Sequence, residues 1–119
     1  MSEQKYMDFY NRQLDYLAKQ DVEGLIHNQY TPDAELLNFD YYIKGTDALI
    51  EYFKGYLKSL GYIKLISTDK YHEGDSAVMF ESTVETAGGV ARVYDVLVMQ
   101  DGKIWRHFAG LLGFTPKGS

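Results

Sequence analysis

Two side chains on neighbouring predicted strands, Asp95 and His107, are the residues of this sequence best suited to acid/base chemistry. Asp95 lies within the apolar run 90–99, and His107 lies within a second apolar run, 104–112. The segment between the runs, residues 100–103, contains Asp-Gly, which is a strong signal for a β-hairpin. Because side chains alternate along a strand, counting by twos places Asp95 and His107 on matching faces. We therefore expect them to share a small-molecule pocket on the concave side of a sheet.

Each of these two residues has a plainer interpretation. The apolar neighbours of Asp95 favour a carboxyl group held away from water, where its neutral form can donate a hydrogen bond. The alternative is an exposed carboxylate, or one paired with Arg92 or Arg106. An imidazole is a general acid or base near neutral pH, and the alternative for His107 is a hydrogen-bonded wall residue without a catalytic role.

The other histidines do not extend this site. His27 and His72 stand alone in the sequence, and we expect both on the surface. None of the three histidines has the spacing of a metal site, and there is no cysteine to act as a ligand. We expect neither a metal nor a cofactor.

Length and charge restrict the class of protein. A chain of 119 residues predicts a single domain over residues 1–119. A net charge of -5 without any run of Lys or Arg argues against nucleic acid and against an anionic membrane surface. The N-terminus does not resemble a signal peptide, so the expected location is cytoplasmic. Eleven tyrosines favour a cavity with apolar walls and a few hydroxyl groups.

The elements that must hold the pocket follow from periodicity. Tyr6, Tyr10, Leu14 and Leu17 have helical spacing, with Ser2 as a cap. After residue 61 the spacing of apolar residues changes from the helical pattern to the alternation that is typical of strands. We predict helices near the N-terminus to residue 17, over 21–28 and over 47–60, and strands over 34–39, 62–71, 76–86, 90–100 and 103–113. This is an α+β architecture in which three N-terminal helices pack on a strongly curved, mostly antiparallel sheet.

The strand over residues 90–100 is apolar on both faces. Val96 and Val98 lie on the face opposite Asp95 and Leu97. In an antiparallel sheet, an apolar outer face implies that something covers it. We expect a homodimer through the outer face of the sheet.

Three segments carry a resemblance to a known family. They are Tyr-Thr-Pro-Asp-Ala-Glu-Leu at 30–36, Gly-Thr-Asp-Ala-Leu at 45–49, and the stretch from Asp95 to Asp-Gly-Lys-Ile at 101–104. In these segments and in the predicted order of its helices and strands, the chain resembles the SnoaL-like branch of the nuclear transport factor two-like superfamily. That superfamily includes ketosteroid isomerases, polyketide cyclases, limonene epoxide hydrolase and scytalone dehydratase. The resemblance implies a cystatin-like conical α+β barrel with a deep pocket, and frequent dimerisation.

The resemblance also assigns roles to single residues. Asp95 falls where ketosteroid isomerases keep a protonated aspartic acid that stabilises an oxyanion. Asn38 stands in place of their general base, and Gln13 lies near their oxyanion-hole tyrosine. Ala109 lies near the catalytic acid of polyketide cyclases. Because an amide does not accept a proton at neutral pH, the resemblance argues against steroid isomerisation by that mechanism.

The resulting hypothesis is a pocket for a small, largely apolar molecule. In the enzyme version, an isomerase, dehydratase or hydrolase acts on a carbonyl or hydroxy compound; His107 moves a proton and Asp95 stabilises negative charge on oxygen. The alternative is a non-catalytic ligand-binding or dimerisation module. Besides Asp95 and His107, the residues expected to contact the ligand are Asn38, Gln13, Trp105, Tyr30, Phe53, Phe80, Leu97 and Ala109.

Overall fold

The computed structural model describes residues 5–118, and its first half forms three helices, α1 (Met7–Lys19), α2 (Val22–Gln29) and α3 (Thr46–Leu60). Asp21 caps α2 at the start of the range predicted for this helix, since its side chain accepts a hydrogen bond from the Gly24 backbone N–H at 3.0 Å. α3 ends at Gly61, whose φ of 79° suits glycine. The cap predicted at Ser2 lies outside the described residues. Within residues 5–118, no helix is long and apolar enough to cross a membrane.

Six strands form one sheet in the order β2-β1-β6-β5-β4-β3. β1 pairs with β6 in parallel, and every other neighbouring pair is antiparallel. The strands are β1 (Tyr30–Leu37), β2 (Tyr42–Lys44), β3 (Ile63–Glu73), β4 (Ala77–Thr86), β5 (Gly89–Gln100) and β6 (Lys103–Pro116). The α+β class and the four-strand meander are confirmed. β1 begins earlier than predicted, and the three-residue β2 was not predicted because so short a strand has no periodicity to detect.

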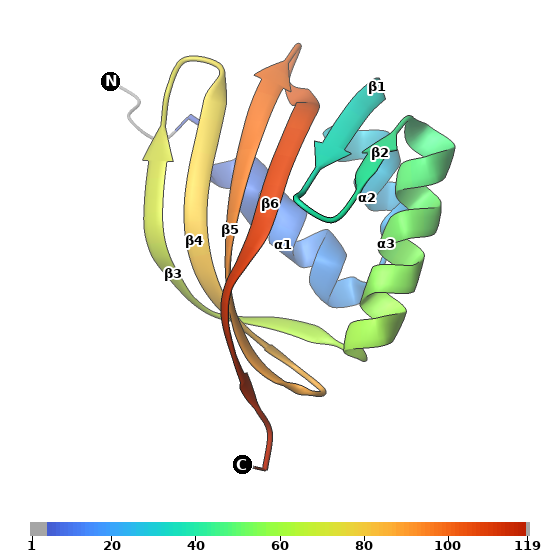
Figure 1. Cartoon of the computed structure of the whole chain (residues 1–119). Coiled ribbons are helices and arrows are strands. Elements are labelled where there is room, and N and C mark those ends of the chain that lie inside the picture. The colour runs from blue at the N-terminus through green and yellow to red at the C-terminus, as the bar shows by residue number, and fades with distance from the viewer. Residues whose placement is uncertain (1–4, 119) are drawn as a thin grey trace.

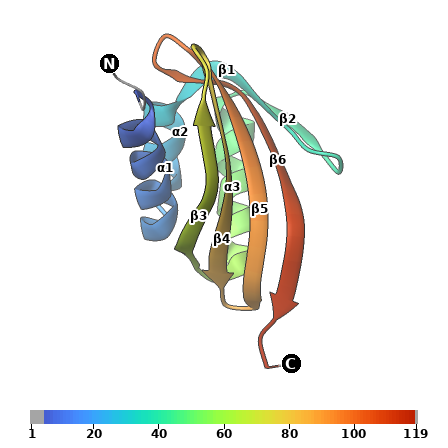
Figure 2. The ribbon, with the colours of Figure 1, turned by 90° about the vertical axis from the view of Figure 1, so that its left-hand side faces the viewer.

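The helices lie on the concave face of the sheet, and the strands β3 to β6 curve around them (Figures 1 and 2). α1 crosses the sheet, while α3 packs against β1 and β2. The core lies between these layers and includes fully buried Leu25, Leu49 and Leu97. Burial of such side chains supplies the main driving force for folding.

A β-bulge in β6 decides which of its side chains face inward. Ile104 pairs with Met99 and Arg106 pairs with Val98, so Trp105 is an extra residue opposite β5. As a result Ile104 and His107 are both buried although they are three residues apart. Trp105 instead stacks under the Arg106 guanidinium, 3.7 Å from the ring centroid. Simple alternation over this strand, which grouped Trp105 with His107, is therefore wrong.

Candidate active site

A cavity of about 410 Å³ lies between the helices and the concave face of the sheet. Its walls come from α1, α3, β1 and the inner faces of β4, β5 and β6. β1 pairs with β6 only as far as Phe108, and beyond it Leu111 and Phe114 are 63% and 50% exposed. Because these two residues also line the cavity, its mouth lies beside the second half of β6.

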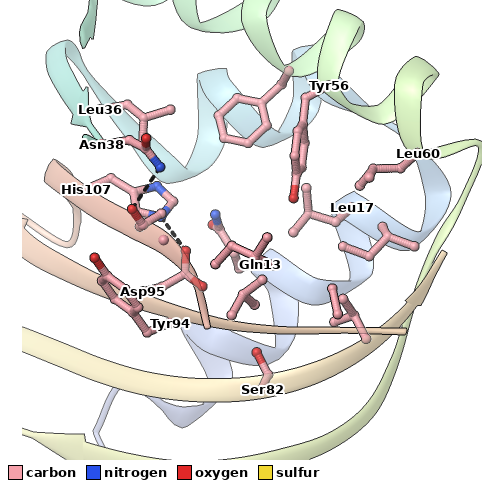
Figure 3. Close-up of a pocket in the computed structure, with 18 of the residues that line it drawn as sticks. Gln13, Leu17, Leu36, Asn38, Tyr56, Leu60, Ser82, Tyr94, Asp95 and His107 are labelled. Carbon is pink, nitrogen blue, oxygen red and sulfur yellow. Dashed lines mark hydrogen bonds and ion pairs between the residues drawn. The ribbon is translucent and has the colours of Figure 1, made fainter. Parts of the chain in front are cut away.

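Asp95 and His107 are brought together at one end of this cavity (Figure 3). Their strands are neighbours, and His107 pairs in register with Leu97, two residues beyond Asp95. The His107 Nε2 atom lies 2.7 Å from Asp95 Oδ1. Within residues 5–118 the Asp95 side chain has no other hydrogen bond, so its second oxygen is available to a ligand. The pair can orient a carboxyl group toward a bound molecule.

The other nitrogen of His107 is also occupied. Nδ1 lies 2.9 Å from the Tyr30 hydroxyl, which in turn receives a hydrogen bond from Gln13 Nε2 at 3.0 Å. The His107 side chain is only 7% exposed. With both nitrogens engaged by protein groups, His107 is placed to hold Asp95, and Asp95 is the member of the pair that a ligand can touch.

Tyr56 supplies a hydroxyl group on the opposite wall (Figure 3). Burial raises the pKa of this hydroxyl to about 12, with a smaller contribution from the negative charge of Asp95. The group is therefore protonated at neutral pH. No residue from 5 to 118 forms a hydrogen bond with it, so its proton is free to be donated to a ligand.

Most residues expected to contact the ligand do line the cavity. Those found in its wall, in addition to Asp95 and His107, are Asn38, Gln13, Phe53, Phe80, Leu97 and Ala109. Tyr30 does not line it; its ring is buried behind His107 and acts through the hydrogen bond to that residue. Trp105 is also absent from the wall, because the bulge turns it away with Arg106.

Asn38 lines the cavity but is tied to the backbone. Its Nδ2 donates to the Ala109 carbonyl at 3.0 Å, and its Oδ1 accepts from the Asp40 N–H at 2.8 Å. These bonds fasten the end of β1 to β6 beside the site. The principal role of this amide is therefore to shape the wall.

Sequence reasoning missed several polar groups at the site. Tyr56 and Tyr10 were not named among the expected ligand contacts, although both reach the cavity. Ser82 also lines it from β4, in the inward set that contains Phe80. Gln29, at the end of α2, is buried and bonded to Gln13. The available signal was a polar side chain at an inward position of an amphipathic element, as for Gln13.

The described part of the chain, residues 5–118, contains no group of three or more His, Asp or Glu side chains that could hold a metal ion.

The fold is similar to several solved structures. A nuclear transport factor 2-like protein from Anabaena variabilis matches with a TM-score of 0.81 at 16% identity, over 95% of both chains. A proposed isomerase of the SnoaL-like family from Agrobacterium tumefaciens matches with a TM-score of 0.78 at 11% identity, over 91% of this chain and 97% of that one. A proposed polyketide cyclase from Sinorhizobium meliloti has a TM-score of 0.76 at 15% identity, over 92% and 100%. At these identities the likeness concerns the fold.

The sequence comparisons agree with the architecture. No curated protein sequence matches significantly. The model of the SnoaL-like domain, however, matches residues 10–107, which include most of α1 and both Asp95 and His107. The chain belongs to the SnoaL-like domain family.

Proposed function

We propose that the protein is an enzyme that removes a proton from carbon next to the carbonyl group of a small, largely apolar compound. The single observation that supports this is the Asp95–His107 pair, joined at 2.7 Å and open to the cavity through one carboxylate oxygen. A carboxylate held by an imidazole in the wall of a largely apolar cavity is suited to general base catalysis. Similar structures described as isomerases and cyclases are consistent with such chemistry.

In the proposed reaction Asp95 accepts the proton, and the electrons of the broken C–H bond move to form an enolate. The negative charge then lies on the substrate oxygen. Tyr56, protonated and without a partner among the described residues, donates a hydrogen bond to that oxygen. Return of the proton from Asp95 to another carbon gives isomerisation. If Asp95 instead gives the proton to a β-hydroxyl group, the enolate expels that group as water and dehydration results.

The remaining wall favours an apolar substrate body. Beyond the Asp95 end, the cavity is lined by aliphatic side chains, among them Leu17, Leu60 and Val84. Such a surface binds hydrocarbon by excluding water and does not orient it through hydrogen bonds. The polar end therefore selects the reacting carbonyl, and the apolar end selects the rest of the molecule.

Hydrogen–deuterium exchange tests the proposal without knowledge of the product. A β,γ-unsaturated ketone, an α-hydroxyketone and a β-hydroxyketone are each incubated with the protein in D₂O, and loss of the proton next to the carbonyl is followed by NMR. We expect exchange with at least one of them. Asp95→Asn lowers its rate by on the order of 10³-fold, because the amide does not accept the proton. Tyr56→Phe lowers it by about tenfold to a hundredfold.

Asp8→Asn is the matched control. Asp8 is exposed on α1 and lies outside the cavity wall, so removing its charge leaves the exchange rate unchanged. Exchange that survives Asp95→Asn would refute the assignment of the base. Binding of these ketones without any exchange would instead favour the alternative, a non-catalytic ligand-binding module.

We propose further that two copies of the chain associate through the outer face of the sheet. Met79, Val96 and Phe108 lie side by side in β4, β5 and β6 on that face, and Met79 is 54% exposed. Light scattering at micromolar concentration is expected to give the mass of a dimer, and Val96→Lys to give a monomer. A monomeric wild-type protein would contradict this.

A further inference from the structure

We infer that Gln29, Gln13 and Tyr30 form a one-directional hydrogen-bond relay that keeps His107 neutral, with its proton on Nε2, and so keeps Asp95 ionised. This inference rests on the proposed function, since it explains what makes Asp95 available as a base. It assigns positioning roles to two glutamines that do not touch the reacting atoms.

The direction of the relay is set by the Phe9 backbone carbonyl, which can only accept a hydrogen bond. The Gln29 Nε2 atom lies 3.2 Å from the Phe9 carbonyl oxygen and 3.3 Å from Gln13 Oε1. A backbone carbonyl has no proton to give, so the end of Gln29 that faces it must be the amide N–H₂. Turning this amide around would set two oxygens against each other in a site that is 2% exposed. The direction of the first step is therefore fixed.

The donor in each following hydrogen bond is determined by the bond before it. Because Gln13 Oε1 accepts from Gln29, its Nε2 is the end that faces Tyr30, and it donates to the hydroxyl oxygen at 3.0 Å. The hydroxyl has a single proton, and its remaining neighbour is His107 Nδ1 at 2.9 Å. Nδ1 must then accept, which leaves the ring proton on Nε2, facing Asp95 Oδ1 at 2.7 Å.

The alternative protonation states carry a penalty. A proton on Nδ1 would point at Tyr30 while Gln13 also donates to that oxygen, and the hydroxyl proton would have no acceptor. The Tyr30 side chain is 2% exposed, so water does not replace the lost partner. An orphaned buried hydroxyl is costly, which disfavours both the imidazolium and the Nδ1-protonated ring. Asp95 consequently faces a neutral donor and remains the charged member of the pair.

Long-range ¹H–¹⁵N correlation spectra of the resting protein report this state directly. The three histidine signals are assigned with His27→Gln and His72→Gln, which lie outside the site. At pH 7 we expect His107 to be protonated on Nε2 only. A spectrum of the Nδ1-protonated ring, or of the imidazolium, would overturn the inference.

Two variants of Gln13 with similar volume distinguish the effect of its hydrogen bonds from the effect of its packing. Gln13→Glu replaces a donor with an acceptor, so Tyr30 gives its proton to the new carboxylate and its oxygen accepts from His107. We expect the imidazolium signature in this variant, with a fall of tenfold or more in the exchange rate because Asp95 is then paired with a cation. Gln13→Met neither donates nor accepts, so His107 Nδ1 remains the one acceptor for the Tyr30 proton, and we expect this variant to keep the Nε2-protonated spectrum. Identical spectra from the two variants would refute the role of the Gln13 amide.

The two proposals fail in different ways. The spectra need no substrate, so they report the relay even if no ketone undergoes exchange. Conversely, exchange that depends on Asp95 together with an Nδ1-protonated His107 would keep the proposed function and remove the relay.

Discussion

The two ends of the cavity are held in different ways. At one end, Asp95 and His107 are joined through Tyr30 to a chain of hydrogen bonds that ends on backbone. At the other end, the wall consists of apolar side chains such as Leu17, Leu60 and Val84, and apolar contacts have no preferred orientation. The hydrogen bonds therefore restrict the side chains of the polar end to one arrangement, whereas the apolar end can adapt to substrates of different shape. Reaction type and substrate size are thus determined by separate parts of one cavity.

Removing the centre of the polar end should have the largest effect. His107→Leu leaves the Asp95 carboxylate without its donor and the Tyr30 hydroxyl without its acceptor, so we expect a loss of about 3 kcal/mol in unfolding free energy. Urea denaturation measures it. Adding Tyr30→Phe removes the orphaned hydroxyl, so the double variant should be more stable than the sum of the single effects predicts. Strict additivity would mean that the two residues are not coupled.

Alkaline pH tests two buried tyrosines, Tyr30 behind His107 and Tyr56 in the cavity wall. Burial is the main reason that the pKa of Tyr30 and of Tyr56 is raised, the latter to about 12 from its ordinary value of 10.0. Their stabilising contribution is complete below pH 10 and is lost as pH rises toward the folded-state values. Unfolding free energy should therefore fall above pH 10, by up to about 1.4 kcal/mol per pH unit for each such group.

Tyr56→Phe should make that fall shallower, because it removes one titrating group. The control is Tyr42→Phe, which alters an exposed tyrosine outside the cavity wall and should leave the slope unchanged. Equal slopes for the wild type and Tyr56→Phe would contradict the assignment.

Changing the apolar end should alter affinity more than chemistry. Leu17→Trp replaces an aliphatic side chain with a bulky ring in the cavity. We therefore expect the affinity for long apolar ketones to fall about tenfold, or about 1.4 kcal/mol in binding free energy. Calorimetry measures this, and the exchange rate of a bound small ketone should stay within about twofold. A large drop in that rate would show that the two ends are not independent.

The smallest expected effect lies outside the cavity. Asp21→Ala removes the cap of α2 and its bond to Gly24, at a cost of about 1 kcal/mol in unfolding free energy. Thermal unfolding measures the change, and ligand affinity should be unaffected. A cost equal to that of His107→Leu would mean that the polar end contributes no more than an ordinary surface contact.

Much of the fold was predictable because its signals are local. Asp21, Gly61 and the Asp-Gly turn before β6 mark the ends of elements, and hydrophobic spacing identifies the elements between them. The pairing of β1 with β6 in parallel joins segments about 70 residues apart, as in Leu36 with His107, and no local pattern specifies it.

The candidate site was predictable in its centre and not in its surroundings. Alternation was enough to bring Asp95 and His107 together, because both strands belong to one hairpin. The roles of Tyr30 and Gln29 depend on hydrogen-bond partners far away in sequence, and these follow only from packing. Trp105 was misplaced because a single extra residue changes the alternation without leaving a sequence signal.

That extra residue has a practical consequence for anyone who redesigns the chain. Deleting Trp105 would remove no cavity contact, and it would place Ile104 two residues before His107, where ordinary alternation keeps both side chains facing inward. We therefore expect the sheet to tolerate the shorter backbone at this point. A variant library that allows any amino acid or a gap at position 105 should keep folded members of both kinds.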